Sequence, residues 1–395
     1  MRNEPASPPV PGDAVGRQLL ISRPHGALGG RLSETLEPTS PYELTIREGC
    51  LEKLGDWFFS SDPIPGNTSD GLLHIDQFTK VFLRLLGSEV ESREIRLGIL
   101  IGPTPDTGTP LVQTEELLES EGNAAGFGDP RRVVRVYRQR IVGRANGTLG
   151  QSSVLVEPSD GRILGLYRVS TPTMPRNTHQ QYEMITEDLS YSAIWLKPAA
   201  SARLYREGRF VAQVIQLRDG LGWTIRIIDD LLVDIERAIR AKTGLDPDAR
   251  LLRTVVEVAC ELSELREGGS VYLVRDAAAL ADLAGESGKG PQLVSIYRPE
   301  RGGLPLYTWD HEAVINLLSQ DGAVIVALHG SQLLASQAYF SGPGGRRQIA
   351  QSICCNDVVP VAAVVVSQDG PLYVAGMPDP ENGRELFEVD RVRYI

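Results

Sequence analysis

The 395-residue sequence has little of what marks secreted, membrane-spanning or disulfide-stabilised proteins. No run reaches the roughly 18 apolar residues that a spanning helix needs, and the first residues lack the apolar stretch of a signal peptide. The cysteines are too few and too irregularly spaced for a disulfide framework or a CxxC pair of the zinc or redox type. There are four of them: Cys50, Cys260, Cys354 and Cys355. We therefore expect a protein of a reducing, cytoplasmic compartment with no membrane partner.

Positive charge is also scarce. The chain has 40 Lys and Arg against 51 Asp and Glu, which gives a net charge of −11 and a pI near 5.1. Such a surface repels phosphate polyanions, so no nucleic-acid partner is expected. Any smaller phosphate ligand must be held by a few well-placed groups.

Enough apolar residues are present for a folded protein of more than one unit. Hydrophobic residues make up 42% of the chain and charged residues 23%, as in ordinary globular proteins. A length of 395 residues exceeds what one core usually organises. The seven prolines of residues 1–41 predict a flexible leader. We expect a sensor-like domain over residues 42–245, a second domain over 246–380 and a C-terminal tail over 381–395.

The apolar patterns predict mixed α/β structure in both domains. In the first we expect a helix over 74–86, strands over 96–101, 132–137, 153–156, 162–167, 192–196, 202–205 and 210–217, and a helix from about 228 that stops at Gly244. In the second, Asp246 and Pro247 should begin a helix that ends at Gly268-Gly269. Strands over 270–274, 292–297, 323–328, 332–335, 361–367 and 372–375 should alternate with helices over 310–319 and 346–355. A polar, glycine-rich loop should join the strands at 274 and 292. The predicted fold class is α/β, a mixed sheet flanked by helices after a separate α+β domain.

Three apparent motifs fail. Gly288-Lys289 lacks the earlier glycine and the following Ser or Thr of a P-loop. His311-Glu312 lacks the second histidine of the zinc-protease pattern and should occupy the first turn of a surface helix, so no zinc site is expected there. His329-Gly330-Ser331 lacks a flanking glycine of a nucleophile elbow.

One constellation survives: Asp321-Gly322-Ala323, followed by Gly345-Arg346-Arg347 at a helix start. The first segment puts a carboxylate, suited to a metal or to proton abstraction, where Gly and Ala let a ligand approach the backbone. The second combines backbone N–H groups, the helix dipole and two guanidinium groups, which suits a triphosphate. Taken singly, these segments are better explained as a turn and as a solvated helix surface.

In order and surroundings the two segments resemble the DAC domain of diadenylate cyclases. That family has a DGA motif, then a Gly-x-Arg-His segment, then a strand ending in Val-Val-Ser-Glu or Val-Val-Ser-Gln. Here these are Asp321-Gly-Ala323, Gly344-Gly-Arg-Arg347 and Val365-Val-Ser-Gln368, and residues 252–262 and 269–274 look like the family's opening helix and first strand. The resemblance covers about 130 residues. The preceding region is similar to a sensor domain fused before some bacterial DAC domains.

The resemblance implies that two ATP-loaded domains meet face to face and form cyclic di-AMP and pyrophosphate with Mg²⁺ or Mn²⁺. It implies that Asp321 is catalytic, holds the metal and helps to deprotonate the attacking hydroxyl. The implied nucleotide contacts are Gly322, Ala323, Gly345, Arg346, Arg347, Ser367 and Gln368.

The chain departs from the family at four places. Arg347 replaces the family's His, and Gly345 replaces its Thr or Ser. Gln348 stands where many members carry a second Arg, and Gln368 stands where many members have Glu. About two extra residues fall within 356–360. Three functions therefore remain open: a diadenylate cyclase regulated by its N-terminal domain, a catalytically impaired nucleotide sensor that binds ATP or a cyclic dinucleotide, and an α/β interaction module without a nucleotide.

Overall fold

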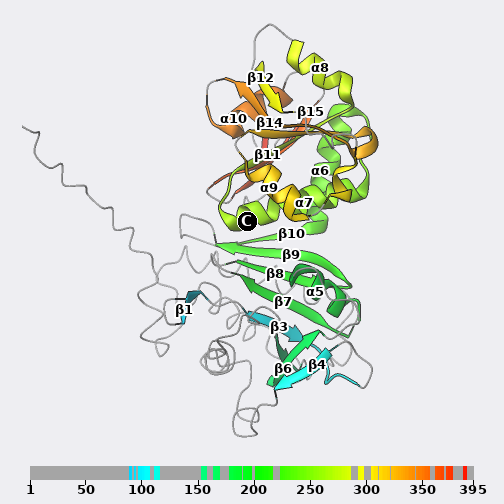
Figure 1. The fold of residues 1–395 in the computed structure, drawn as a ribbon, viewed down its shortest axis with the longest axis vertical. Helices are drawn as coiled ribbons and strands as arrows, with labels where there is room; N and C mark the ends of the chain where they lie inside the picture. The colour runs from blue at the N-terminus through cyan, green and yellow to red at the C-terminus, as the bar shows by residue number, and fades with distance from the viewer. Residues whose placement is uncertain are drawn as a thin grey trace, which may run out of the picture.

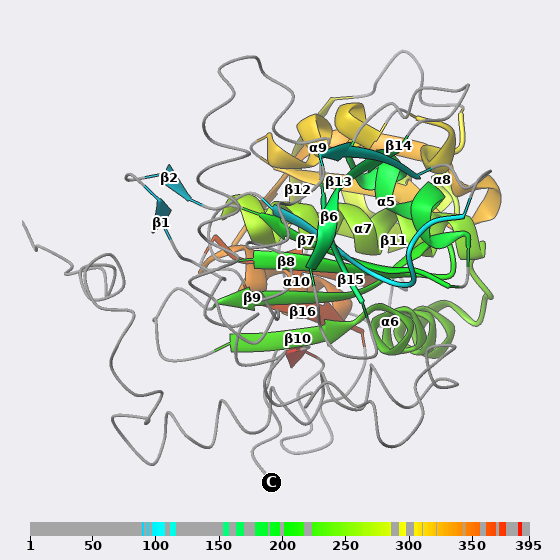
Figure 2. The same cartoon turned by 90° about the horizontal axis from the view of Figure 1, so that it is seen from below.

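The computed structural model of the chain (Figures 1 and 2) has two mixed β-sheets flanked by helices. It describes residues 89–90, 93–94, 97–106, 111–115, 153–157, 163–169, 178–188, 190–197, 201–216, 223–285, 292–297, 304–309, 311–320, 322–342, 344–355, 361–368, 371–376 and 386–388. The helix expected over 74–86 and the strand expected over 132–137 lie outside these residues. None of the helices in the described ranges is long and apolar enough to cross a membrane.

The first sheet has eight strands in the order β10-β9-β8-β7-β3-β5-β6-β4. Strands β3 and β5 run parallel, and the other neighbours run antiparallel. The strands are β3 (Leu97–Ile101), β4 (Leu111–Glu115), β5 (Ser153–Val156), β6 (Ile163–Val169), β7 (Ser192–Lys197), β8 (Ser201–Arg206), β9 (Arg209–Gln216) and β10 (Trp223–Ile227). Helix α5 (Thr178–Thr186) packs against β7, β8 and β9, while β1 (Glu89–Val90) and β2 (Arg93–Glu94) form a separate hairpin.

The second sheet has seven strands in the order β12-β14-β13-β11-β15-β16-β17. Strands β11 and β13 run parallel, and the other neighbours run antiparallel. The strands are β11 (Gly269–Val274), β12 (Gln292–Tyr297), β13 (Ala323–Ala327), β14 (Leu333–Ser341), β15 (Val361–Val366), β16 (Leu372–Ala375) and β17 (Leu386–Glu388).

Alternation along the central strands gives this sheet two apolar faces. Val271 and Leu273 of β11 join the core beneath α6 (Ile228–Thr243), α7 (Ala249–Leu265) and α9 (His311–Ser319). Tyr272 and Val274, from the same strand, pack with α8 (Ala277–Gly285) and α10 (Arg346–Cys354). Successive strand residues point to opposite faces, so a sheet covered on both sides reads as one continuous apolar run. The short 3₁₀ helices η3 (Leu306–Thr308) and η4 (His329–Ser331) complete the unit.

Helices α6 and α7 join the two sheets. Helix α6 contacts β9 and β10 of the first sheet and β15 and β16 of the second, as Figure 2 shows. Its left-handed C-cap is Gly244, as predicted. A single core cluster runs from the first sheet through both helices into the second sheet. The predicted domain boundary at 245/246 falls between these two helices.

Buried charges reinforce this contact. Arg203 of β8 is fully buried and donates to both oxygens of Glu264 on α7, at 2.8 and 2.9 Å, and also to Glu261. Lys197 of β7 donates to Glu264 as well. Gln213 of β9 donates to the Cys260 carbonyl and to Glu264. Burial alone would raise the pKa of Glu264, but the charges of Arg203 and Lys197 lower it, so Glu264 stays ionised.

The structure corrects several local predictions. Helix α7 has Asp248, not Asp246, as its N-cap, and the Asp248 carboxylate accepts from the Arg250 N–H at 2.8 Å. The predicted loop after Val274 contains α8, capped by Asp276, whose carboxylate accepts from two backbone N–H groups. Helix α5 and strand β10 were not expected, and β14 runs six residues beyond its predicted end at Ala335.

Candidate functional site

The DGA segment leads into the start of β13, where the backbone is unusually tight. Gly322 has φ +101°, and a Cβ there would lie 2.7 Å from backbone atoms of Gln337 on β14. Gln337 itself has φ +48°, and its side chain donates to Gln320 at 2.8 Å across the same turn. Only glycine fits at 322 without displacing β14. Ala323, the next residue, is buried in the core between the sheet and α10.

The arginine segment approaches this edge of the sheet from α10. A Cβ on Gly268, directly before β11, would lie 2.6 Å from Arg346 Nη1 and 3.0 Å from Gln368 Cγ. Arg346 and Gln368, the residue that follows Val-Val-Ser in the chain, therefore meet at Gly268. Strands β11 and β13 both begin here and β15 ends here, since Gly269 pairs with Val366 and Val271 with Val324.

The pKa of the nearby Tyr272 phenol is consistent with this position of Arg346. Burial raises the pKa of the Tyr272 phenol well above its ordinary value, and the charge of Arg346 opposes that shift. The guanidinium thus lies near the face of β11 that α10 covers. A cation held beside a helix N-terminus and a sheet edge suits an anionic ligand.

Arg347 points elsewhere. Its Nη1 donates to the Tyr373 hydroxyl at 3.1 Å, and its guanidinium lies 5.2 Å from the centre of that ring. Tyr373 belongs to β16, three strands from β13 in the sheet. The two neighbouring arginines therefore diverge, and only Arg346 reaches Gly268.

The N-terminus of α10 is partly closed by its own residues. Gln348 Oε1 accepts from the Gly345 N–H at 2.7 Å, so this amide is already engaged within the helix. The Ser367 N–H donates to the Pro371 carbonyl and closes the β15–β16 turn. Ser367 is half-buried and Gln368 is exposed.

Of the residues predicted for the site, the structure brings Arg346 and Gln368 together, on the strand edge beside Gly322 and Ala323. It does not bring Arg347 to that point. Asp321 lies outside the described residues. The sequence pattern marks Gly268 only as part of a helix stop, and it does not mark Tyr373 at all.

Comparison with known protein families finds no match, and comparison with curated proteins finds none either. Among solved structures, a double mutant of DacA from Staphylococcus aureus is 18% identical, over 35% of this chain and 85% of that chain, with a TM-score of 0.23. A hypothetical membrane spanning protein from Bacillus cereus is 14% identical, over 40% of this chain and 72% of that chain, with a TM-score of 0.28. At these TM-scores neither similarity carries an argument about this chain.

Proposed function

We propose that the C-terminal unit binds ATP at the edge formed by Gly268, Gly322, Ala323, Arg346 and Gln368, and acts as a diadenylate cyclase. The observation that carries the proposal is the convergence of Arg346 and Gln368 on Gly268. The segments that contain Arg346 and Gln368 resemble successive motifs of the DAC family. They meet beside β13, the strand that follows the DGA segment. If the resemblance were accidental, nothing would require these segments to lie together at one edge of the same sheet.

Each group has a defined task in this reaction. Arg346 neutralises phosphate charge, and the partly exposed Gly322, with Ala323 after it, would line the nucleotide at the start of β13. Asp321, which directly precedes Gly322 in the chain, would hold Mg²⁺ or Mn²⁺ and assist deprotonation of the 3′-hydroxyl. That hydroxyl attacks the α-phosphate of a second ATP, and pyrophosphate leaves. Two attacks give cyclic di-AMP and two pyrophosphates, so two domains must meet face to face.

A second candidate has specific support. The hydrogen bond from Arg347 to Tyr373 holds the second guanidinium away from Gly268, and Gln348 caps the helix where many relatives carry another Arg. Fewer cations at the phosphates favour a nucleotide sensor that binds ATP or a cyclic dinucleotide without turnover. Phosphoryl-type transfer depends mainly on positioning and charge neutralisation, so a missing cation costs rate more than binding.

The N-terminal sheet is proposed as the regulatory part of the molecule. Arg203 and Lys197 hold Glu264, and the chain runs from Glu264 through Arg266 to Gly268 within four residues. A displacement of β7 or β8 would reach the proposed nucleotide edge through these contacts and the end of α7.

The test uses the full chain with ATP and either Mg²⁺ or Mn²⁺. Chromatography measures cyclic di-AMP and pyrophosphate, and calorimetry measures ATP binding. We expect product from the wild type and none from Asp321→Asn. Arg346→Ala should weaken ATP binding about 10–150-fold, the loss of a charge-assisted hydrogen bond of about 1.5–3 kcal/mol. Arg237→Ala, on the exposed face of α6, is the matched control and should bind as the wild type does.

Each outcome separates the candidates. ATP binding without product under either metal selects the sensor. Absence of ATP and cyclic-dinucleotide binding overturns both nucleotide functions and leaves the interaction module. Equal ATP binding by wild type and Arg346→Ala removes the proposed edge as the phosphate site.

A further inference from the structure

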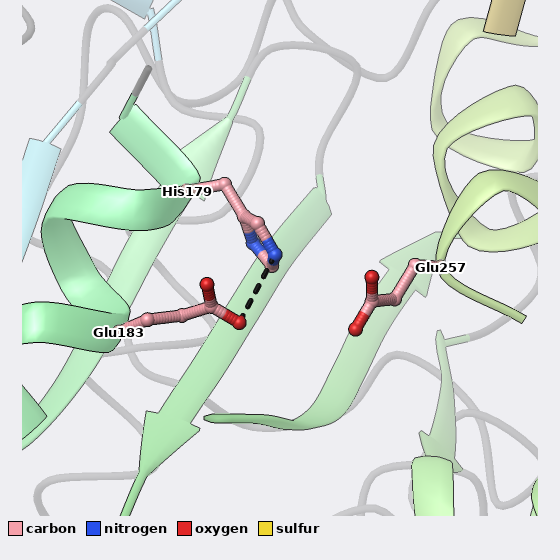
Figure 3. A group of neighbouring side chains, drawn as sticks. All are labelled: His179, Glu183 and Glu257. Carbon is pink, nitrogen blue, oxygen red and sulfur yellow. Dashed lines mark ion pairs between the residues drawn. The ribbon is translucent and has the colours of Figure 1, made fainter. Parts of the chain in front are cut away.

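A second cluster of chemically reactive side chains lies about α5 and α7, on the side of α7 away from the second sheet. His179 and Glu183 come from α5, one turn apart, and Glu257 comes from α7. Figure 3 shows the imidazole and both carboxylates pointing into one space between the two helices. One ligand atom from each residue lies within 4.8 Å of the other two, and all three side chains are partly buried.

A hydroxyl group and neighbouring aromatic rings hold the His179 imidazole in its orientation. Its Nδ1 lies 3.0 Å from the Tyr205 hydroxyl, and its Nε2 faces Glu183 at 3.2 Å. Tyr205 and Phe210 lie against the ring, and His311 of α9 stacks on it at 6.0 Å and 13°. A histidine that binds a metal through Nε2 almost always donates its Nδ1 proton to an oxygen acceptor, and the Tyr205 hydroxyl is placed to accept it when Nδ1 carries the proton.

The structural alternative is a simple ion-pair cluster. His179 pairs with Glu183, and Glu257 pairs with Arg253 of its own helix at 3.2 Å. These pairs leave two carboxylates facing one imidazole, so negative charge gathers at the shared space. The pairing of Arg253 with Glu257 neutralises only part of this charge.

The ligand set selects the kind of cation. Mg²⁺ and Ca²⁺ prefer six or more oxygen ligands, whereas one imidazole nitrogen and two carboxylate oxygens suit Zn²⁺ or a similar transition ion. Ligand atoms at about 2.0–2.1 Å from a tetrahedral zinc are about 3.4 Å apart. The His179 and Glu183 ligand atoms already lie 3.2 Å apart, and separations of up to 4.8 Å must close by as much as about 1.4 Å through rotation of the glutamate side chains.

We propose that His179, Glu183 and Glu257 form a zinc-class divalent site that cross-links α5 to α7, with its fourth position left to water. The proposal is independent of the nucleotide function, because no ligand belongs to the strand edge around Gly268. Bound metal would tie the first sheet to α7 beside the buried pair of Arg203 and Glu264.

The first experiment needs no variant. The full chain is freed of metal with a chelator and titrated with Zn²⁺ in a calorimeter, and X-ray absorption then reports the ligand atoms. We expect one ion per chain, bound by one imidazole and by oxygens, with no sulfur. Failure of the wild type to bind zinc, or sulfur in the ligand shell, overturns the proposal.

Matched substitutions then place the ion. Glu257→Gln should weaken zinc binding by at least about 100-fold, and Tyr205→Phe by about 10–100-fold through loss of the imidazole's orientation. Glu236→Gln, an exposed glutamate of α6 in an i,i+4 pair, and His329→Gln, on the exposed surface of η4, are the controls and should bind as the wild type does. His179→Gln must lose binding while its circular dichroism stays unchanged. Undiminished affinity in both His179→Gln and Glu257→Gln would assign the ion to another place and refute this site.

Discussion

Gly268 offers a direct test of the nucleotide edge, because one added methyl group should separate binding from stability. Gly268 is buried and does not have the positive φ that alanine avoids. Its Cβ would lie 2.6 Å from Arg346 Nη1, so the guanidinium must retreat by about 0.8 Å to reach an ordinary contact of about 3.4 Å. Gln368 must also shift, from 3.0 Å.

The folding cost of Gly268→Ala is small. The displaced atoms, Arg346 Nη1 and Gln368 Cγ, belong to flexible side chains rather than to the backbone. Alanine in an unstrained backbone usually gains about 0.4–1 kcal/mol through the unfolded state. We expect the free energy of unfolding in urea to stay within about 1 kcal/mol of the wild type. A misplacement of about 1 Å at a reacting group can cost about 100-fold in rate. ATP affinity should fall about 10–150-fold if one charge-assisted hydrogen bond from Arg346 is lost.

The control is Gly244→Ala, which should show the opposite pattern. Gly244 has φ +70° at the end of α6, and its Cβ would meet nothing within 4 Å. Alanine there costs about 1 kcal/mol of stability through left-handed strain and leaves ATP affinity unchanged. Calorimetry with ATP and urea titrations give both quantities. An ATP affinity of Gly268→Ala within twofold of the wild type would refute the assignment of phosphate binding to Arg346.

Three further predictions concern stability. Gly322→Ala should destabilise the chain by about 3 kcal/mol or more, because its Cβ meets the Gln337 backbone at 2.7 Å and its φ is +101°; a urea midpoint equal to that of the wild type would contradict the tight turn. Glu264→Gln should cost about 3 kcal/mol by leaving Arg203 buried with weaker pairing, whereas exposed Glu236→Gln should cost less than about 1 kcal/mol; equal effects on the unfolding free energy would show that burial does not matter. Because the pKa of Glu264 is lowered in the folded state from the ordinary 4.5, its contribution is full above that pH and is lost as pH falls below it. In urea titrations between pH 6 and 3, the free energy of unfolding should therefore fall less steeply for Glu264→Gln than for the wild type. Parallel pH profiles for the two proteins would contradict this expectation.

Local patterns predicted the second unit well because its elements carry their own signals. The strand expected over 292–297 and the strand over 372–375 have the predicted bounds, and the helix over 346–355 ends one residue earlier. Apolar runs with glycine or proline boundaries identify buried strands without tertiary information.

The errors have physical causes. Asp248 follows Pro247 and caps α7 itself, so the pattern of an aspartate before a proline placed the start two residues early. Helix α8 was hidden by the glycines that follow it, although Asp276 before an alanine-rich run is an N-cap signal. Strand β14 continues past Ala335 through an irregular pairing at Gln337, where Gly322 of the neighbouring segment approaches closely.

The candidate site was predictable only in part. Sequence order singled out Gly322, Ala323 and Arg346, but the partner of Arg347 is Tyr373, 26 residues away in the chain. Likewise, His179 and Glu257 have no common motif, and their proximity depends on how α5 and α7 face each other. Contacts of this kind follow from tertiary packing and leave no local pattern.

Helix α7 was predicted from its local pattern, but the pattern did not show what its glutamate face contacts. Its apolar residues join the core with the second sheet, but Glu257, Glu261 and Glu264 recur on another face at helical spacing. On an isolated helix such a stripe is a solvated surface. Here Arg203 and Lys197 pair with Glu261 and Glu264, and Glu257 faces His179 and Glu183. One helix therefore carries these charged contacts to the first sheet and ends just before Gly268, so under the proposed function a ligand of the first sheet would act on the proposed nucleotide edge through α7.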